Sequence, residues 1–246
     1  MYKTVKALVL RQVRYKEADR ILSLFTDSDG KMTAKARGAL RKSSRSAAAT
    51  QQLVYAEMNL FGNRGRWTVN EAALIEDFKG LTEDIESYAL GCYVAECLDA
   101  FSIEEQPDAA LLQLGLNTLY ALSRKLYPPE HIKAAFEMRL MCLSGYEPEL
   151  AACPECGCTE PERPVLNMEK GSISCKSCCG GGLPLCPASL QALRYIASAP
   201  AKQLFSFRLE GESAKLLYRA CELYLLRNAE RGFQTLDYWK SLRAFN

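Results

Sequence analysis

The chain has 246 residues, of which 48% are hydrophobic and 24% charged, and its net charge is +2. This composition is typical of a folded globular protein of one large or two ordinary domains, and it argues against disorder. No window approaches 18 uninterrupted apolar residues. The start, MYKTVKALVLRQ, has a short apolar core but lacks the long apolar region and small-residue cleavage site of a secretory signal. We therefore expect a cytoplasmic protein that has no membrane partner.

The small net charge conceals an asymmetry along the chain. Residues 1–80 contain 15 Lys and Arg against 8 Asp and Glu, whereas the remainder contains 16 against 21. A basic N-terminal part is typical of a protein that meets a polyanion. The basic residues are concentrated in GKMTAKARGALRKSSRS (residues 30–46), which has no acidic residue and six basic ones: Lys31, Lys35, Arg37, Arg41, Lys42 and Arg45. A solvated surface loop is the alternative interpretation of such a run.

The first 80 residues show the two-residue period of β-strands. In TVKALVLRQ, Val5, Ala7 and Val9 fall on one face. RILSLFT predicts a second strand, DSDGK a turn and KMTAKARGAL a third strand. LVYAEMNLF and RWTVNEAAL flank GNRG, which is a hairpin signal. Five short strands without a helix predict a five-stranded OB-fold barrel in residues 1–80, a fold that often binds nucleic acids.

From about residue 81 the hydrophobic period becomes helical. LTEDIESYALGCYVAECLDAF begins with Thr82 as the expected N-cap. Further helices are predicted over about 108–126, over EHIKAAFEMRLMCLS before Gly145, and near 188–198 and 213–229. We therefore predict an α+β multidomain protein in which residues 81–246 form an all-α helical domain. A four-cysteine zinc-binding module is inserted in that domain at about residues 150–186.

Seven of the 11 cysteines fall within 34 residues, in a chain without an export signal, which indicates metal binding rather than disulfides. CPECGC and CKSCCGGG supply two Cys-x2-Cys pairs with 18 residues between them, a spacing at which two knuckles bind one zinc ion. The predicted ligands are Cys153, Cys156, Cys175 and Cys178. Four thiolates leave no open coordination position, so the zinc would be structural. Reduced thiols without a metal are the alternative, and three neighbours could replace a ligand: Cys158, Cys179 and Cys186.

The sequence does not favour an enzyme. It contains no G-x-x-x-x-G-K-[ST] phosphate loop, no H-E-x-x-H motif and no dinucleotide-binding glycine fingerprint. Its one histidine, His131, lies on a predicted helix, where a plain surface or core position is the simpler interpretation. A metal-dependent nuclease site is the remaining alternative, but salt bridges and turn chemistry explain its four acidic residues more simply: Glu17, Asp19, Asp27 and Asp29.

If the basic run lies on a strand of the barrel, its basic side chains are arranged in a regular row. If residues 31–40 form a strand, alternate side chains share one face, among them Lys31, Lys35 and Arg37. The spacing of roughly 6.6 Å between residues i and i+2 of a strand is comparable to the step between phosphates of a single strand. We predict that all six basic residues bind DNA, with a log–log salt slope of about −4 for single strands. Three aromatic residues are available for base stacking, but each is expected in the barrel core: Tyr15, Phe61 and Trp67.

Two segments carry a resemblance to a known family. KALVLRQVRYKEADRILSLFTDSDGKMTAKARGALRKSSRS (residues 6–46) resembles the opening of RecO, a family of bacterial DNA-repair and recombination-mediator proteins. FEMRLMCLSGYEPELAACPECG (residues 136–157) is similar to the family's helix that leads through GY-x-P-x-L into its zinc-binding pairs. The resemblance extends over essentially the whole chain and is strongest at residues 5–46 and 136–178.

The resemblance implies an N-terminal OB-fold, a C-terminal helical domain and a zinc site held by the four cysteines. It also implies a non-enzymatic recombination mediator that binds single- and double-stranded DNA through the six basic residues and anneals complementary strands. With RecR, such a protein helps to load RecA onto DNA coated with single-strand-binding protein, in the cytoplasm at the nucleoid. A zinc-stabilised protein-interaction scaffold without direct DNA binding is the alternative.

A further implied partner is the acidic, apolar C-terminal tail of the single-strand-binding protein, which the family docks on its helical domain. The predicted helix AKLLYRACELYLLRNAERGF offers apolar residues beside three arginines for this tail: Arg219, Arg227 and Arg231. A plain amphipathic core helix with a basic edge is the simpler interpretation of the same pattern.

Overall fold

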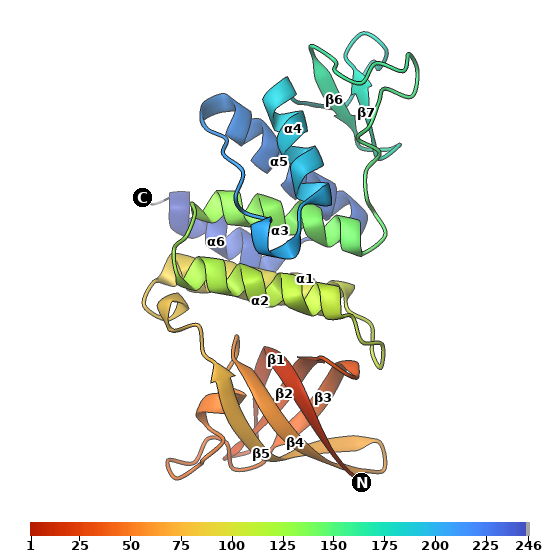
Figure 1. Cartoon of the computed structure of the whole chain (residues 1–246). Helices are drawn as coiled ribbons and strands as arrows, with labels where there is room; N and C mark the ends of the chain where they lie inside the picture. Colours follow the sequence, from red (N-terminus) through yellow and green to blue (C-terminus); the bar gives the residue numbers. More distant parts are fainter. Residues whose placement is uncertain (245–246) are drawn as a thin grey trace. The chain divides into compact units, whose positions relative to one another are not determined.

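The structure is a computed structural model that describes residues 1–244, and it divides into two compact units. The first contains Met1–Lys125 and the C-terminal segment that begins at Phe233, and the second contains Leu126–Gly232. A five-stranded barrel and, within the described residues, six α-helices confirm the predicted α+β class (Figure 1). The division into domains at residues 1–80 and 81–246 stays a prediction. No helix in residues 1–244 is both long and apolar enough to cross a membrane.

Five strands of the first unit form a closed barrel in the order β1-β2-β3-β5-β4 (Figure 1). They are β1 (Tyr2–Tyr15), β2 (Asp19–Thr26), β3 (Gly30–Ala36), β4 (Tyr55–Asn63) and β5 (Arg66–Glu76). Neighbouring strands are antiparallel, except that β3 and β5 pair in parallel and so close the barrel. A closed barrel of five short strands is the OB-fold that the sequence predicts.

Strand β1 is long enough to pair along both of its halves. Its first half pairs with β4 over Tyr2–Leu8, and its second half pairs with β2 over Ala7–Tyr15. A register shift between Val9 and Arg11 marks a β-bulge, the kind of irregularity that bends a strand. Tyr2 and Tyr15 therefore lie at opposite ends of one strand, separated by a path of roughly 40 Å along the chain.

Alternate side chains along the strands point inward, and the apolar ones among them fill the barrel interior. Val5, Ala7 and Val9 are buried in the core cluster, as their spacing predicts. Leu8, on the other side of the strand, is buried as well, and α1 (Ile85–Phe101) contacts β1. The outer side of β1 is consequently open to solvent only towards its ends.

Strand β3 ends at Ala36, four residues before the end of the strand that the sequence predicts. Met32 and Ala34 face the core, whereas Lys31 and Lys35 are only half-buried. Gly38 then adopts a φ of 65°, a conformation that favours glycine and turns the chain out of the sheet. The residues that follow β3 therefore form a loop of turns and not the continuation of a strand.

Helices α1, α2 (Ala109–Ser123) and α6 (Gln234–Ala244) complete the first unit. The side chain of Asp84 caps α1 by accepting a hydrogen bond of 3.1 Å from the Ser87 N–H. The predicted cap, Thr82, instead donates its hydroxyl to the Lys79 carbonyl in a preceding turn. The sequence did not predict α6, which packs on α1 but buries only two large apolar side chains, Leu236 and Trp239.

The second unit contains α3 (Pro129–Leu143), α4 (Pro187–Ser198) and α5 (Gly211–Ala229), which contact one another. A small sheet in the order β7-β6-β8 lies between α3 and α4 in the chain (Figure 1). Its strands are β6 (Pro164–Asn167), β7 (Ser172–Cys175) and β8 (Leu183–Pro184). One cysteine pair precedes this sheet and the other lies at the end of β7, so the four cysteines belong to the C-terminal region, as predicted.

A buried ionic cluster joins α3 to α5. Lys133 Nζ lies 2.8 Å from a carboxylate oxygen of Glu137 and 2.8 Å from one of Glu222. The side chains of Lys133 and Glu137 are 4% and 0% exposed. Burial by itself would lower the pKa of Lys133, but the two carboxylates raise it above its ordinary value. The lysine is therefore charged in the folded protein and neutralises two acids at this helix contact.

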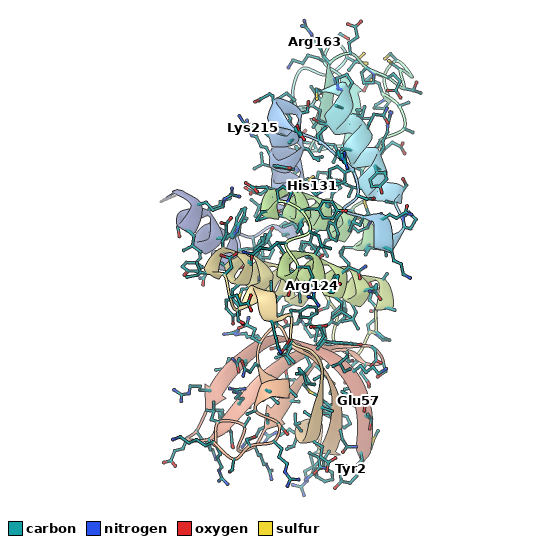
Figure 2. All side chains as sticks on the ribbon, turned by 60° about the vertical axis from the view of Figure 1, so that its left-hand side comes forward. Tyr2, Glu57, Arg124, His131, Arg163 and Lys215 are labelled. Carbon is teal, nitrogen blue, oxygen red and sulfur yellow. The ribbon has the colours of Figure 1, made fainter. Side chains whose placement is uncertain are left out.

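Replacing Lys133 by Met is expected to lower the free energy of unfolding by about 3–5 kcal/mol, because buried carboxylates would lose their cation. Urea denaturation followed by circular dichroism measures this change. Lys215 provides a control, since its pair with Glu212 is exposed (76% and 75%; Lys215 is labelled in Figure 2). Lys215→Met should change the stability by less than about 0.5 kcal/mol. Similar small effects of both substitutions would contradict the role given to the cluster.

Candidate functional site

Side chains of β2 hold the loop of residues 37–47, called here the basic loop, at both of its ends. At the first end Asp19 accepts a hydrogen bond from the Gly38 N–H (2.8 Å) and pairs with Lys35 Nζ (2.9 Å). At the second end Arg20 donates to the Ala47 carbonyl and to the Thr50 hydroxyl, both at 3.1 Å. The basic loop is therefore fixed to the barrel beside the turn between β1 and β2.

Four of the six predicted DNA-binding residues lie in the basic loop and are exposed: Arg37, Arg41, Lys42 and Arg45. None of the four forms a salt bridge with another residue of the described chain, 1–244. Cations that no carboxylate neutralises keep their full attraction for a polyanion. The loop thus offers four free positive charges within nine residues.

The other two predicted residues, Lys31 and Lys35, have carboxylate partners. Lys31 Nζ donates to the Asp99 carbonyl (2.7 Å) and lies 3.6 Å from the Asp99 carboxylate, so it connects β3 to α1. The Lys35 ammonium, together with the Gly38 N–H, lowers the pKa of Asp19 below its ordinary value and keeps that carboxylate ionised. The predicted row of three cations along β3 is not formed, because the strand ends before Arg37 and both lysines are paired.

Sequence reasoning missed three basic residues of the β1–β2 hairpin: Arg11, Arg14 and Lys16. All three are exposed. The Leu40 N–H donates to the Ala18 carbonyl (2.9 Å), which places the basic loop against the turn of this hairpin. The segment RQVRYK (residues 11–16) is as dense in cations as the basic loop, and that density was the available signal. We call the basic loop and these hairpin residues, with Tyr15, the loop surface.

Tyr15 does not lie in the barrel core as predicted, because it belongs to the outward face of β1. Its side chain is 43% exposed. Lys16 Nζ and Lys35 Nζ lie 5.6 and 4.9 Å from the centre of its ring. An exposed aromatic ring among cations is the kind of platform on which an unpaired base stacks.

Phe61 also differs from the prediction, whereas Trp67 agrees with it. Phe61 is 37% exposed and lies against Tyr2, with 5.0 Å between the ring centres. Trp67 is half-buried and packs against the barrel core, and Lys3 Nζ lies 4.0 Å from its ring centre. Both aromatic residues lie near the turn between β4 and β5, at the end of β1 opposite Tyr15.

The four acidic residues of the nuclease alternative do not converge. Asp27 and Asp29 occupy the turn between β2 and β3, where Asp29 pairs with Lys3 (2.6 Å) and Asp27 accepts from the Lys6 N–H (3.0 Å). Asp19 is at the other end of β2, near Glu17. Within residues 1–244, cysteines form the one cluster of metal-binding side chains. These acids therefore do not assemble a metal-dependent nuclease site.

The four predicted cysteine ligands do converge. The Sγ atoms of Cys153, Cys156, Cys175 and Cys178 all lie within 4.8 Å of one another, and Cys156 and Cys175 are 3.6 Å apart. A tetrahedral zinc ion bound by four sulfurs at 2.3 Å requires sulfur–sulfur distances of about 3.8 Å. The four thiols can therefore hold one metal ion of thiolate-preferring chemistry.

A short turn brings together the two cysteines of each Cys-x2-Cys pair. The Gly157 N–H donates to the Cys153 carbonyl (2.8 Å), and the Cys178 N–H donates to the Cys175 carbonyl (3.0 Å). Gly157 has a φ of 72°, which permits the first turn to reverse. The Cys175 N–H approaches Cys153 Sγ (3.5 Å) and lowers the pKa of the Cys153 thiol to about 6, whereas burial and the neighbouring thiols raise that of Cys175. Backbone donors thus favour the thiolate form of Cys153.

The other three cysteines of this module do not join the cluster. Cys179 donates its thiol to the Gly181 carbonyl at 2.7 Å. Cys186 caps α4, where its sulfur meets the N–H and hydroxyl of Ser189. Cys158 lies outside the group of converging sulfurs. The geometry therefore favours the two Cys-x2-Cys pairs over their neighbours.

The apolar side of helix α5 and the side chain of His131 are part of the core of the second unit. The apolar side of α5 is buried in contact with α3 and α4, while Arg219 and Arg227 are exposed, and Arg231 follows the end of the helix. His131 is buried, with its Nε2 2.9 Å from the Phe205 carbonyl, and burial lowers its pKa. The apolar face of α5 is consequently not available to a docking peptide.

Two family models match the chain over most of its length. Residues 1–78 match the model described as Recombination protein O N terminal, and residues 82–237 match Recombination protein O C terminal. Relatives named DNA repair protein RecO are similar throughout. Those of Acetivibrio thermocellus and Symbiobacterium thermophilum are each 32% identical, covering 98% of this chain and 97% of the relative. That of Listeria monocytogenes is 27% identical over 96% of both chains.

The matches to both models, together with an OB-fold barrel and a four-cysteine cluster at the positions that the resemblance implies, lead to one conclusion. This chain belongs to the RecO family of DNA repair proteins.

Proposed function

We propose that this chain is a recombination mediator that binds single- and double-stranded DNA through the loop surface and acts without catalysis. The single observation that supports the binding site is the group of four exposed, unpaired cations in the basic loop. Arg14 and Lys16 extend this positive surface onto the adjoining hairpin. Contacts of this kind go to phosphates, so the binding should depend strongly on salt and little on base sequence.

The two paired lysines have supporting roles in this proposal. Lys35 keeps Asp19 ionised, and Asp19 in turn holds the Gly38 N–H at the start of the basic loop. Lys31 holds β3 against α1 through its contacts with Asp99, a residue of that helix. Lys35 also lies against Tyr15 of the loop surface, whereas Lys31 is near the other end of β3. Both charges are largely compensated by their aspartate partners.

Annealing of complementary strands follows from the same charges. Two single strands repel each other through their phosphates, and cations held between them reduce that repulsion without nucleotide hydrolysis. With RecR, a protein of this kind would help to load RecA onto DNA coated by single-strand-binding protein. The acidic tail of the coating protein would dock on the helical part of the chain, at a place other than the buried face of α5.

We further propose that the four-cysteine cluster binds one structural zinc ion. Zinc suits four thiolates in a tetrahedron, and such a site has no open position for a reactant. The sheet of β6, β7 and β8 is too small to bury a core of its own, so a metal bound across its two turns would stabilise it.

The loop surface is tested by replacing Arg37, Arg41, Lys42 and Arg45 together with Gln. Loss of four phosphate contacts should weaken binding of single-stranded DNA at low salt and reduce the magnitude of the log–log salt slope by about 3. Fluorescence anisotropy with oligonucleotides of several sequences measures both quantities.

The matched control replaces four cations of the second unit with Gln: Lys202, Arg208, Lys215 and Arg219. It changes the net charge equally but should leave affinity and slope near those of the original chain. If the two variants lose affinity equally, the basic loop is not the DNA site. If the unchanged chain does not bind DNA but binds other proteins, the scaffold alternative holds.

The metal centre is tested by elemental analysis of protein purified without chelators, which should find about one zinc ion per chain. Cys156→Ser should abolish stable zinc binding and lower the melting temperature, because three thiolates leave an open position. Cys179→Ser, next to the predicted ligands, should retain the zinc. Zinc in the Cys156 variant, or its loss from the Cys179 variant, would overturn this ligand set.

The mediator activity is tested by annealing of complementary strands with and without single-strand-binding protein, under a salt titration and without ATP. Annealing of bare strands should be fastest at low salt and fall as the phosphate contacts are screened. A chain that binds DNA but never accelerates annealing would be a DNA-binding protein of another kind.

A further inference from the structure

A second surface of the barrel combines exposed aromatic rings with unpaired cations. It consists of Tyr2, Phe61, Arg64 and Arg66, and we call it the hairpin surface. Tyr2 is 64% exposed and lies at the end of the barrel (Figure 2), with its ring against that of Phe61. Arg64 and Arg66 are exposed and form no salt bridge with any residue that the structure describes.

The backbone explains why these cations project. Asn63 pairs with Arg66, so only Arg64 and Gly65 connect β4 to β5. Their φ values are 50° and 74°, as in the tight two-residue turns that follow the twist of a hairpin. The turn therefore holds Arg64 and Arg66 beside Phe61 at a fixed place on the barrel. An aromatic pair flanked by fixed arginines provides both a stacking platform and phosphate contacts.

A neutral band separates the hairpin surface from the loop surface. Across the sheet, Phe61 is followed by Thr68, Lys35, Ile21 and Val13 in register. The one charge in this row, on Lys35, is compensated by Asp19. In the next row Thr33 and Ser23 are neutral, and the row then reaches Arg11 of the loop surface. The positive charges of the barrel are therefore collected in two places and not spread as one continuous track.

Carboxylates limit the hairpin surface on its other side. Glu57 lies on the same outward face of β4 as Phe61, and its side chain is exposed on the wall of the barrel (Figure 2). Glu71 of β5 is exposed opposite Asn59. These acids repel a polyanion along β4 and β5, so a bound strand would be confined to the turn and the N-terminal end of β1.

We propose that the hairpin surface binds a second single strand of DNA while the loop surface binds the first. Unpaired bases would stack on Phe61 and Tyr2, and phosphates would meet Arg64 and Arg66. This inference rests on the proposed function and adds the place of the second strand. Because stacking on a ring leaves the pairing edge of a base free, one barrel would present two strands ready to pair.

The test uses two short, non-complementary oligonucleotides of about six nucleotides, within the site sizes known for OB-folds. One carries a donor dye and the other an acceptor dye. At low salt the original chain should bind both at once, which energy transfer at a stoichiometry of two oligonucleotides per chain would show. Native mass spectrometry of the same mixture verifies that a single copy of the chain holds both strands.

Trp67 provides an independent signal. The chain has two tryptophans, and Trp67 lies beneath the hairpin surface, next to Lys3. In a Trp239→Phe background, binding of the second oligonucleotide should quench the remaining tryptophan fluorescence. Binding of the first oligonucleotide, at the loop surface, should leave that fluorescence almost unchanged.

The decisive variant is Phe61→Ser with Arg64→Gln and Arg66→Gln. It should bind one oligonucleotide, lose the energy transfer and anneal at least about tenfold more slowly, the size expected for loss of a stacked base. The matched control is Tyr120→Ser with Arg124→Gln and Lys125→Gln, which also removes one exposed aromatic ring and two cations. Arg124 lies on the helical part of this unit (Figure 2), and the control should anneal at the original rate.

The possible outcomes separate this inference from the function on which it rests. If the original chain binds one oligonucleotide per copy at saturation, or if the hairpin variant anneals normally, the second site does not exist although the DNA-binding proposal stands. If the original chain binds no oligonucleotide, the proposed function itself fails. Unchanged circular dichroism and zinc content of the hairpin variant exclude a general loss of structure.

Discussion

The barrel depends on one constraint, which is that β1 pairs along both halves with different strands. Its first half pairs with β4 and its second half pairs with β2, so this one strand joins the two sides of the barrel that the pairing of β3 with β5 closes. The bulge between Val9 and Arg11 lets the strand bend from one partner to the other. This arrangement places the β4–β5 turn at one end of β1 and the basic loop at the other. The two positive surfaces are therefore separated by the same pairing that builds the fold.

Carboxylate partners decide which basic residues of the barrel remain available for a polyanion. Lys3, Lys31 and Lys35 each meet an aspartate, and these three lysines are partly buried. The arginines of the basic loop and of the β4–β5 turn meet none among the described residues. A buried cation must be compensated because its desolvation is costly, whereas a cation at a loop tip stays solvated and can remain unpaired. Available charge is therefore found at the turns and not along the strands.

The cysteine module shows how much a short-range motif can specify. Each Cys-x2-Cys pair is brought together by one turn, so its geometry depends on four residues and not on the whole fold. Tertiary structure contributes the contacts that bring the second pair to the first: the pairing of β6 with β7, the bridge between Glu149 and Ser172, and the hydrogen bonds of Arg194 to the segment around the first pair. Sequence spacing could therefore predict the four converging sulfurs, while the direction of the Cys179 and Cys186 thiols depended on local partners that spacing does not reveal.

The sequence by itself determined the five strands, five of the six helices described, the cysteine cluster and the segment in which the exposed cations lie. These features follow from periodicity, turn residues and spacing, all of which act over a few neighbouring residues. Only the tertiary structure decided that β3 ends at Ala36, that Tyr15 and Phe61 face solvent, and that Lys31 and Lys35 are paired with aspartates. Each of these depends on contacts between distant parts of the chain. Helix α6 belongs to the same group, since its few apolar residues give a weak pattern and its stability comes from packing on α1.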